Sequence, residues 1–248
     1  MITKCLFRQV PALSLPSCSS SNTRNVAALP SLKLYSFRKR IAEKLSNKYN
    51  EKRVHEIGPD LACLEWLMEC GSTCVEMSDG QRLTRIREMK EYIPHVLAAK
   101  DDFEKPSLQV GDLSYEKSWP NAPYTHIRIV DASDSAIANE GFKYLKDVRR
   151  ISTLKLNFCD YFGDEALKYL ALGRPVHSLE DLEIVLNPCV TDGAVYWLKK
   201  LKSLKRAHFY FLPYVSSRQA FIRQLKVALP KCKVTFPEVS NVGYGYEK

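Results

Sequence analysis

The sequence predicts an α/β fold in which short parallel strands alternate with short helices over residues 127–236. Four apolar-x-apolar segments of the strand type begin, at nearly even spacing, at residues 127, 154, 182 and 207. A polar turn and a short apolar run typical of a helix follow the first three, with the runs at residues 141–145, 165–170 and 193–198. Unrelated β-α units are the alternative explanation, but a register shared by four units favours true repeats.

The residues that follow each strand indicate the kind of repeat. A period of roughly 20–29 residues, with an Asn or Cys five positions after the strand begins, is the leucine-rich signature. Cys159 and Asn187 stand at that position in the second and third units. Their side chains are expected to point inward and bind backbone groups of the turns. In the third unit, Val190 is expected to fill the core, and Thr191 or Asp192 to cap the next helix. The predicted fold class is α/β, a leucine-rich-repeat curved parallel sheet.

An N-terminal α-helical domain is predicted before the repeats, over residues 43–123. A polar helical stretch begins at Glu43 and continues to His55. A second helix begins at Pro59, because Pro suits the first helical position and the following Asp60 suits the positive end of the helix dipole. Gly71 is a natural residue to end that helix. Because terminal repeats need a cap, this helix is expected to cover the open end of the repeat sheet.

The rest of the 43–123 domain and the C-terminal end show weaker patterns. Residues 79–123 are charged and rich in turn signals, which favours an inserted loop region. Within it, residues 81–99 are expected to hold a helix broken at Pro94. The repeat domain itself spans residues 124–237. Residues 238–248 have no periodicity and are expected to form a flexible tail.

The first 42 residues are basic, rich in serine and free of acidic residues. They contain seven Lys or Arg and no Asp or Glu, which is typical of a mitochondrial transit peptide. A basic tail without structure is the alternative. The whole chain has a net charge of +9, from 37 basic and 28 acidic residues. Without residues 1–42 the balance is 30 to 28, so the remaining chain is near neutral and nucleic-acid binding is not expected.

Catalytic and metal motifs are missing from the sequence. There is no Gly-x-Ser-x-Gly, no phosphate-binding loop and no His-Glu-x-x-His. The eight cysteines form no Cys-x-x-Cys pair, so buried free thiols are expected rather than a zinc site. Cys63, Cys70 and Cys74 would share a face if they lay on one helix. The sequence therefore predicts a protein that is not an enzyme.

Several longer segments resemble a known family. Residues 54–71 resemble the N-terminal segment of mitochondrial coupling factor B, also called the s subunit of ATP synthase. Residues 129–142, 187–193 and 212–215 resemble that family too. The likeness runs from about residue 54 to residue 236, and an acid-free leader precedes it, as in the family.

The resemblance implies a function and a metal site. The family is non-enzymatic, lies on the matrix side of the mitochondrial inner membrane and is peripheral to it. It associates with membrane-sector subunits of ATP synthase and supports the coupling of proton flow to ATP synthesis. It also binds Mg²⁺ through two backbone carbonyls, which correspond here to Gly71 and Ser133. Oxygen ligands completed by water suit that ion.

The chain departs from the family at two points, and two other classes remain open. The close dithiol of the family is Asn157-Phe-Cys159 here, and the segment from Gly80 to Tyr124 is longer. One alternative is a leucine-rich assembly factor for the membrane arm of respiratory complex I, which shares the repeats and an ending like Leu229-Pro-Lys-Cys232. The other is a cytosolic substrate adaptor of the F-box leucine-rich type. The acid-free leader argues against the adaptor.

The outward positions of the predicted strands are candidates for partner binding. Side chains alternate along a strand, so residues between buried positions face away from the core. Those residues, which are expected to line a concave protein-binding face, are Arg128, Lys155, Glu183 and His208. They are mixed in charge, which predicts a polar protein surface as the partner.

Overall fold

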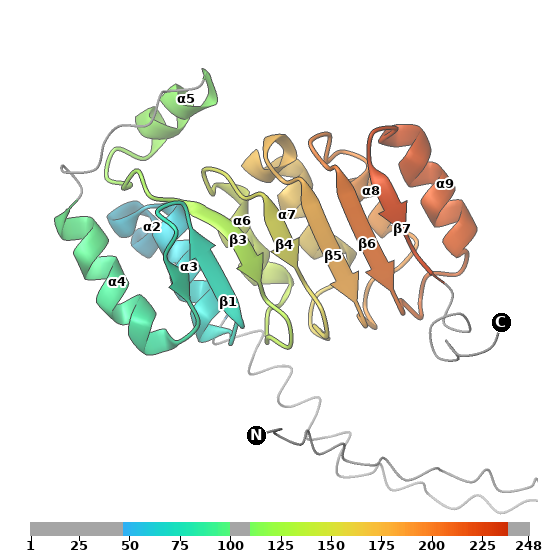
Figure 1. Cartoon of the computed structure of the whole chain (residues 1–248), viewed down its shortest axis with the longest axis horizontal. Coiled ribbons are helices and arrows are strands. Elements are labelled where there is room, and N and C mark those ends of the chain that lie inside the picture. Colours follow the sequence, from blue (N-terminus) through green and yellow to red (C-terminus); the bar gives the residue numbers. More distant parts are fainter. Residues whose placement is uncertain (1–46, 100–109, 238–248) are drawn as a thin grey trace, which may run out of the picture.

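A computed structural model of the chain describes residues 47–99 and 110–237, and only the backbone of residues 110–113. The predicted transit peptide and flexible tail lie outside these residues. Seven strands of the described part form one sheet in the order β2-β1-β3-β4-β5-β6-β7 (Figure 1). Strands β3 to β7 run parallel, as expected, whereas β1 pairs antiparallel with β2 and β3. The strands are β1 (Cys74–Met77), β2 (Arg82–Leu83), β3 (Ile127–Asp131), β4 (Thr153–Lys155), β5 (Asp181–Val185), β6 (Arg206–Tyr210) and β7 (Lys233–Thr235).

A layer of helices covers one side of the sheet (Figure 1). Each helix of this layer packs on the next one along the chain, from α3 through α6, α7 and α8 to α9. The predicted helical runs are therefore confirmed, although the first of them begins as a 3₁₀ turn. The helices are α2 (Glu51–Ile57), α3 (Pro59–Glu69), α4 (Ile86–Ala98), α5 (Val110–Ser118), α6 (Lys143–Lys146), α7 (Asp164–Leu172), α8 (Ala194–Leu198) and α9 (Arg218–Ala228), with 3₁₀ turns η2 (Asn139–Phe142) and η3 (Arg174–His177).

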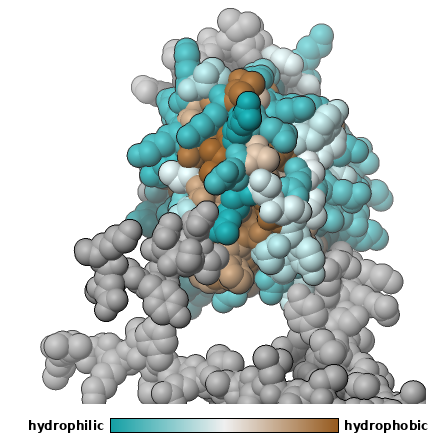
Figure 2. Space-filling view, turned by 90° about the vertical axis from the view of Figure 1, so that its right-hand side faces the viewer, coloured by the Kyte–Doolittle hydropathy of each residue, from teal (hydrophilic) through white to brown (hydrophobic). Residues whose placement is uncertain are grey.

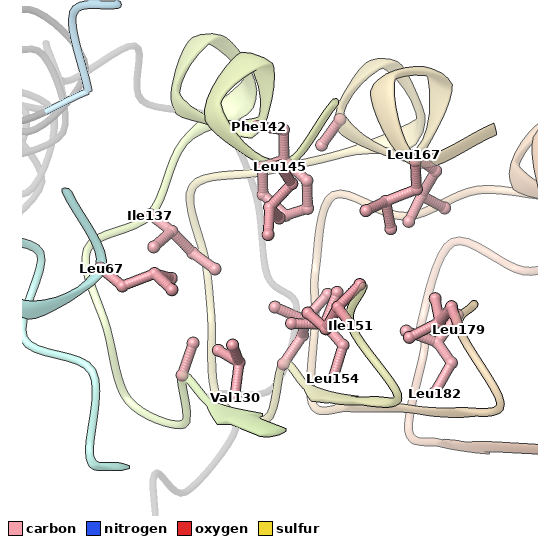
Figure 3. Close-up of a cluster of buried hydrophobic side chains, with 14 of the residues drawn as sticks. Leu67, Val130, Ile137, Phe142, Leu145, Ile151, Leu154, Leu167, Leu179 and Leu182 are labelled. Atoms are coloured by element: carbon pink, nitrogen blue, oxygen red, sulfur yellow. The ribbon is translucent and has the colours of Figure 1, made fainter. Parts of the chain in front are cut away.

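The hydrophobic core lies between the sheet and the helix layer. Val130, Leu154 and Leu182 stand in register on neighbouring strands and are fully buried. Figure 3 shows them pointing toward Phe142 and Leu167 of the helical side. This arrangement explains the sequence pattern, because each repeat buries one apolar strand row against one apolar helix face.

Leu182→Ala is expected to lower the free energy of unfolding by about 3 kcal/mol, because Leu182 is 0 % exposed and its removal leaves a cavity. Denaturant unfolding followed by circular dichroism measures this. Leu172→Ala is the control, since Leu172 is 54 % exposed and should lose less than about 0.5 kcal/mol. A loss below about 1 kcal/mol for Leu182→Ala would contradict its place in the core.

The register of the first repeat differs from the prediction. Ile127 and Ile129 were both expected to face inward, but Ile129 is half-exposed and Val130 is buried instead. On strand β1, Glu76 pairs with Ile129 while Met77 pairs with Ile127, so Arg128 is an extra residue. This β-bulge interrupts the alternation of side chains. It puts Val130, rather than Ile127, beside Leu154.

The N-terminal end of the sheet is closed by a hairpin, which corrects the expectation that the helix at Pro59 covers it. Strand β1 pairs along the free edge of β3, and α3 packs in the helix layer against α6. The helix does begin at Pro59, as predicted. Gly71 follows its end with φ +87°, a conformation that favours glycine.

Two other helix predictions in this domain were wrong. The described residues 47–50 are not helical, and α2 begins only at Glu51, because the Asn50 side chain accepts from the Arg53 N–H and caps it. Helix α4 runs through Pro94 without a break. It buries Met89 and Ile93 on one side, and this burial outweighs the single backbone hydrogen bond that a proline removes.

The inward Asn and Cys of the repeats are confirmed. Asn187 is 0 % exposed and its amide nitrogen donates to the carbonyls of Cys159 (2.7 Å) and Phe162 (3.1 Å). Its oxygen accepts from the N–H groups of Cys189 (2.7 Å) and Val190 (2.9 Å). The Cys159 thiol donates to the Ala132 carbonyl at 3.1 Å. These bonds tie each turn to its neighbour, and the fully buried Val190 fills the core as expected.

The expected helix cap in the third repeat was wrong. Gly193 is the N-cap of α8, with no side-chain capping bond. Thr191 and Asp192 connect repeats instead. The Asp164 carboxylate accepts from the Thr191 N–H at 2.9 Å, and the Asp192 carboxylate accepts from the Ser216 N–H at 2.9 Å. The carboxylates of these turns thus form hydrogen bonds to a neighbouring repeat.

Candidate functional site: the open face of the sheet

The side of the sheet opposite the helix layer forms an open polar face. Four strands bring Asp131, Lys155, Glu183 and His208 into one row, each residue paired in register with the next. All four are half-exposed. Arg128, which was expected to begin this row, lies on the same face but at the bulge, so Asp131 takes its place beside Lys155. The row therefore alternates acidic and basic groups.

Local contacts hold most of these side chains. Arg128 makes an ion pair with Glu76 of the neighbouring strand. Glu183 accepts a hydrogen bond from the Asn157 amide at 2.9 Å. The His208 Nδ1 lies 2.7 Å from the Thr235 hydroxyl.

Lys155 differs from its neighbours in the row. Among the described residues, no ion pair engages its amine. Lys155 lies between Asp131 and Glu183 in the row, but neither carboxylate is close enough to its amine to form an ion pair.

A row of apolar residues, two exposed and one half-exposed, borders this face where the strands end. Phe158, Leu186 and Phe211 stand three positions after Lys155, Glu183 and His208, and each has a positive φ of 49–59°. Phe158 is 54 % and Phe211 41 % exposed. Bulky residues rarely adopt this conformation.

This apolar border was missed from the sequence. The backbone explains its geometry, since the N–H of Phe158 donates to the Val185 carbonyl and that of Leu186 to the Tyr210 carbonyl. A polar face with an apolar border is suited to contact with another protein. A large apolar residue three positions after Lys155, Glu183 and His208 is the signal that could have revealed it.

The structure brings together the two segments that carry the expected magnesium ligands. The Cys70 carbonyl accepts from the Ala136 N–H at 2.8 Å, and the Thr73 hydroxyl donates to the Ser133 carbonyl at 3.0 Å. Gly71 and Ser133 thus lie on adjoining turns. A carbonyl oxygen has a second lone pair after accepting one bond. Carbonyl oxygens completed by water are a ligand set that suits Mg²⁺, and the magnesium site at Gly71 and Ser133 stays a prediction. Clusters of three or more His, Cys, Asp or Glu suited to a metal do not occur among the described residues.

A buried polar network ties the N-terminal helices to the repeats. Asp60 is 2 % exposed and accepts from the Tyr115 hydroxyl (2.7 Å), the Ile127 N–H (3.1 Å) and the Arg149 N–H (3.0 Å). Burial, together with the charge of Asp60, raises the pKa of Tyr115 well above its ordinary value, so the phenol stays a donor. The Arg149 guanidinium lies 4.4 Å from the Tyr115 ring centroid.

Arg149 of this network also lines a cleft of about 750 Å³, to which His126, Arg128, Arg174 and His177 contribute. Burial lowers the pKa of His126, and the charge of Arg149 acts in the same direction, against that of Asp60. Most of the charged side chains that line this cleft are cationic.

Four of the six described cysteines are buried free thiols, as predicted: Cys63, Cys70, Cys159 and Cys232. Burial raises the pKa of Cys63 well above its ordinary value and that of Cys70 to about 12. Cys74 lies on strand β1 rather than on the helix of the other two. Thiols with such high pKa values are poor nucleophiles, because the thiolate is the reactive form.

Comparison with known proteins gives one consistent result. No protein-family model matches the chain. The chain is similar to proteins named "ATP synthase subunit s, mitochondrial" from Homo sapiens and Bos taurus, both 27 % identical, and from Rattus norvegicus, 28 % identical. Each match covers 189 residues, which is 76 % of this chain and 80 % of the relative.

The matched length exceeds the repeat domain, so the similarity does not come from leucine-rich periodicity alone. It agrees with the resemblance found in the sequence, which also spans the N-terminal helical segment. The chain is therefore a homologue of subunit s of mitochondrial ATP synthase, the leucine-rich-repeat protein also called coupling factor B.

Proposed function

We propose that this protein is a non-enzymatic component associated with mitochondrial ATP synthase, which supports the coupling of proton flow to ATP synthesis through protein contacts. It acts at the matrix face of the inner membrane and binds membrane-sector subunits of the synthase. Homology to subunit s over 76 % of the chain is the observation that carries this proposal. The open polar face and its apolar border support it, because an uncovered repeat sheet is a common protein-binding surface.

Attachment to the membrane is peripheral in this proposal. Within the described residues, every helix is too short or too polar to cross a bilayer. In this proposal, magnesium has a structural role. The carbonyls of Gly71 and Ser133 would hold the ion where the turn after α3 meets the turn after β3. A bound cation would supply a link between these turns, whose hydrogen bonds already join the helical domain to the first repeat.

The partner-binding role of the open face is tested by reversing the charge of Lys155. We expect Lys155→Glu to lower the recovery of ATP synthase subunits with the tagged full-length protein from mitochondria by about tenfold, equivalent to about 1.4 kcal/mol. Lys155 is preferable to Arg128, since Arg128→Glu would also break the ion pair with Glu76 that joins β3 to β1. Lys168→Glu is the matched control, because Lys168 is exposed on α7, on the opposite side of the sheet.

The outcomes separate the proposal from its alternatives. Equal recovery of synthase subunits with Lys155→Glu and Lys168→Glu would mean that the open face does not contact the synthase. Recovery of complex I membrane-arm subunits in place of ATP synthase would replace the proposed function with that of an assembly factor. Leu229 and Cys232, which suggested that alternative, are both buried, so their place in the turn after α9 is explained by packing.

A further inference from the structure

The charges of the chain are separated along the sheet. Residues 193–237 contain ten Lys or Arg and no Asp or Glu. Residues 43–192 contain nineteen Lys or Arg and twenty-six Asp or Glu. In the fold, the acid-free stretch is the C-terminal end, formed by α8, β6, α9 and β7. Residues 193–237 therefore have a formal charge of +10 and residues 43–192 one of −7.

Helix α9 presents a second apolar strip on its solvent side. Phe221 and Leu225 of this helix are buried against the core. On the other side, Val227 is 78 % exposed and Ile222 is half-buried. These two residues line a shallow depression of about 450 Å³ together with Gln219, Arg223 and Lys226. Figure 2, which faces this end of the molecule, shows apolar residues in a narrow strip bordered by hydrophilic ones.

Helix α8, which packs against α9, adds aromatic and basic groups. Tyr196 is 53 % exposed. The Lys200 amine lies 4.6 Å from the Tyr196 ring centroid and 4.7 Å from that of Trp197. Tyr and Trp beside lysine are the groups that prefer the boundary between lipid headgroups and acyl chains.

The basic groups on and after α9 are not neutralised within the fold. Among the described residues, no ion pair involves four exposed cations of this end: Arg223, Lys226, Lys231 and Lys233. Their charge is therefore available to an anionic partner.

We propose that this surface, defined by the outward residues of α8, of α9 and of the turn that follows α9, docks on an anionic phospholipid bilayer. A basic surface is attracted to anionic lipid headgroups, and exposed aliphatic groups between the cations can enter the acyl boundary. Val227 and Ile222 favour a bilayer over a nucleic acid, because aliphatic side chains can enter the acyl boundary but gain nothing from contact with a phosphate backbone. The inference deepens the proposed function, on which it rests for the membrane concerned: it names the surface that makes the peripheral attachment.

Sedimentation with vesicles tests the proposal directly. The full-length protein is mixed with vesicles of equimolar phosphatidylcholine and phosphatidylglycerol, and with vesicles of phosphatidylcholine alone. We expect binding to the first kind only. The double variant Lys226→Glu/Lys231→Glu should bind about twenty-five-fold more weakly or worse, because each lysine near an anionic bilayer contributes about fivefold.

Matched variants control for a general effect of charge or of apolar side chains on vesicle binding. Lys52→Glu/Lys90→Glu makes the same charge change with two exposed lysines of the N-terminal half, on α2 and α4. It should keep its affinity within about threefold. Val227→Ser should weaken binding, whereas Ile86→Ser, at an exposed position of α4, should not. Each variant carries the same basic N-terminal segment, so that segment cannot produce a difference. Thermal unfolding checks that all of them are folded.

Three results would overturn the proposal. The first is equal binding of the two double-lysine variants, and the second is binding to vesicles of phosphatidylcholine alone with unchanged affinity. The third is loss of ATP synthase subunits from the Lys226→Glu/Lys231→Glu pull-down without loss of vesicle binding, which would make this end a protein contact. The vesicles contain no protein, so a failure here leaves the synthase association to be judged on its own experiment.

Discussion

Replacing Asp60 by alanine should lower the free energy of unfolding by about 4 kcal/mol. Asp60 is almost fully buried and accepts hydrogen bonds from one tyrosine hydroxyl and two backbone N–H groups. Without the carboxylate, all three donors remain buried without this acceptor. The buried Arg149, stacked on Tyr115, also loses a nearby negative charge. The cost therefore combines lost hydrogen bonds with an uncompensated cation.

Asp79 offers a closely matched control for this substitution. Its carboxylate also accepts from a tyrosine hydroxyl, that of Tyr92 at 2.7 Å, and from a backbone N–H, that of Gln81 at 2.9 Å. Asp79 is exposed, so water replaces those bonds and Asp79→Ala should cost less than about 1 kcal/mol. Urea unfolding of both variants measures the difference. Equal losses would mean that Asp60 is not the buried junction between the helical domain and the repeats.

The second large effect is expected for Asn187→Ala, which should also lose about 4 kcal/mol of stability. The side chain satisfies two buried carbonyls and two N–H groups of the turns on either side of it. Alanine fills none of these roles, and the site is closed to solvent. The same loss should appear in amide hydrogen exchange, as faster exchange of the Cys189 and Val190 N–H groups.

Asn157 serves as the control, because it occupies a neighbouring repeat but faces the open side. Its amide donates only to Glu183, and its oxygen has no hydrogen-bond partner in the structure. Asn157→Ala should therefore change stability by less than about 1 kcal/mol. A loss as large as that of Asn187→Ala would show that the inward direction of Asn187 is not what makes it important.

The proposed protein and lipid surfaces can be used at the same time. The row from Asp131 to His208 lies on the side of the sheet away from the helix layer. The lipid-binding residues lie on α8 and α9, at the C-terminal end of that layer. Docking through the C-terminal end therefore leaves the open face accessible to a partner.

Much of the fold could be predicted from the sequence, because the spacing of the repeats indicates where each strand and each helix lies. Leu154 recurs as Leu182 and Cys159 as Asn187, at the same spacing, and each position keeps the same environment in successive units. A buried row and an outward row follow from strand alternation alone. The start of α3 at Pro59 and its end before Gly71 rest on local backbone preferences, which a short segment carries by itself.

The features that the sequence did not reveal depend on contacts between distant segments. The bulge at Arg128 exists because β1 pairs with β3, and no periodicity within residues 127–131 records that pairing. Asp60 looked like a residue favoured by the helix dipole, whereas its partners Ile127 and Arg149 are 67 and 89 positions away. Local patterns determine which side of an element faces a core. Only tertiary packing decides which remote donors meet there and which cations at the surface stay unpaired.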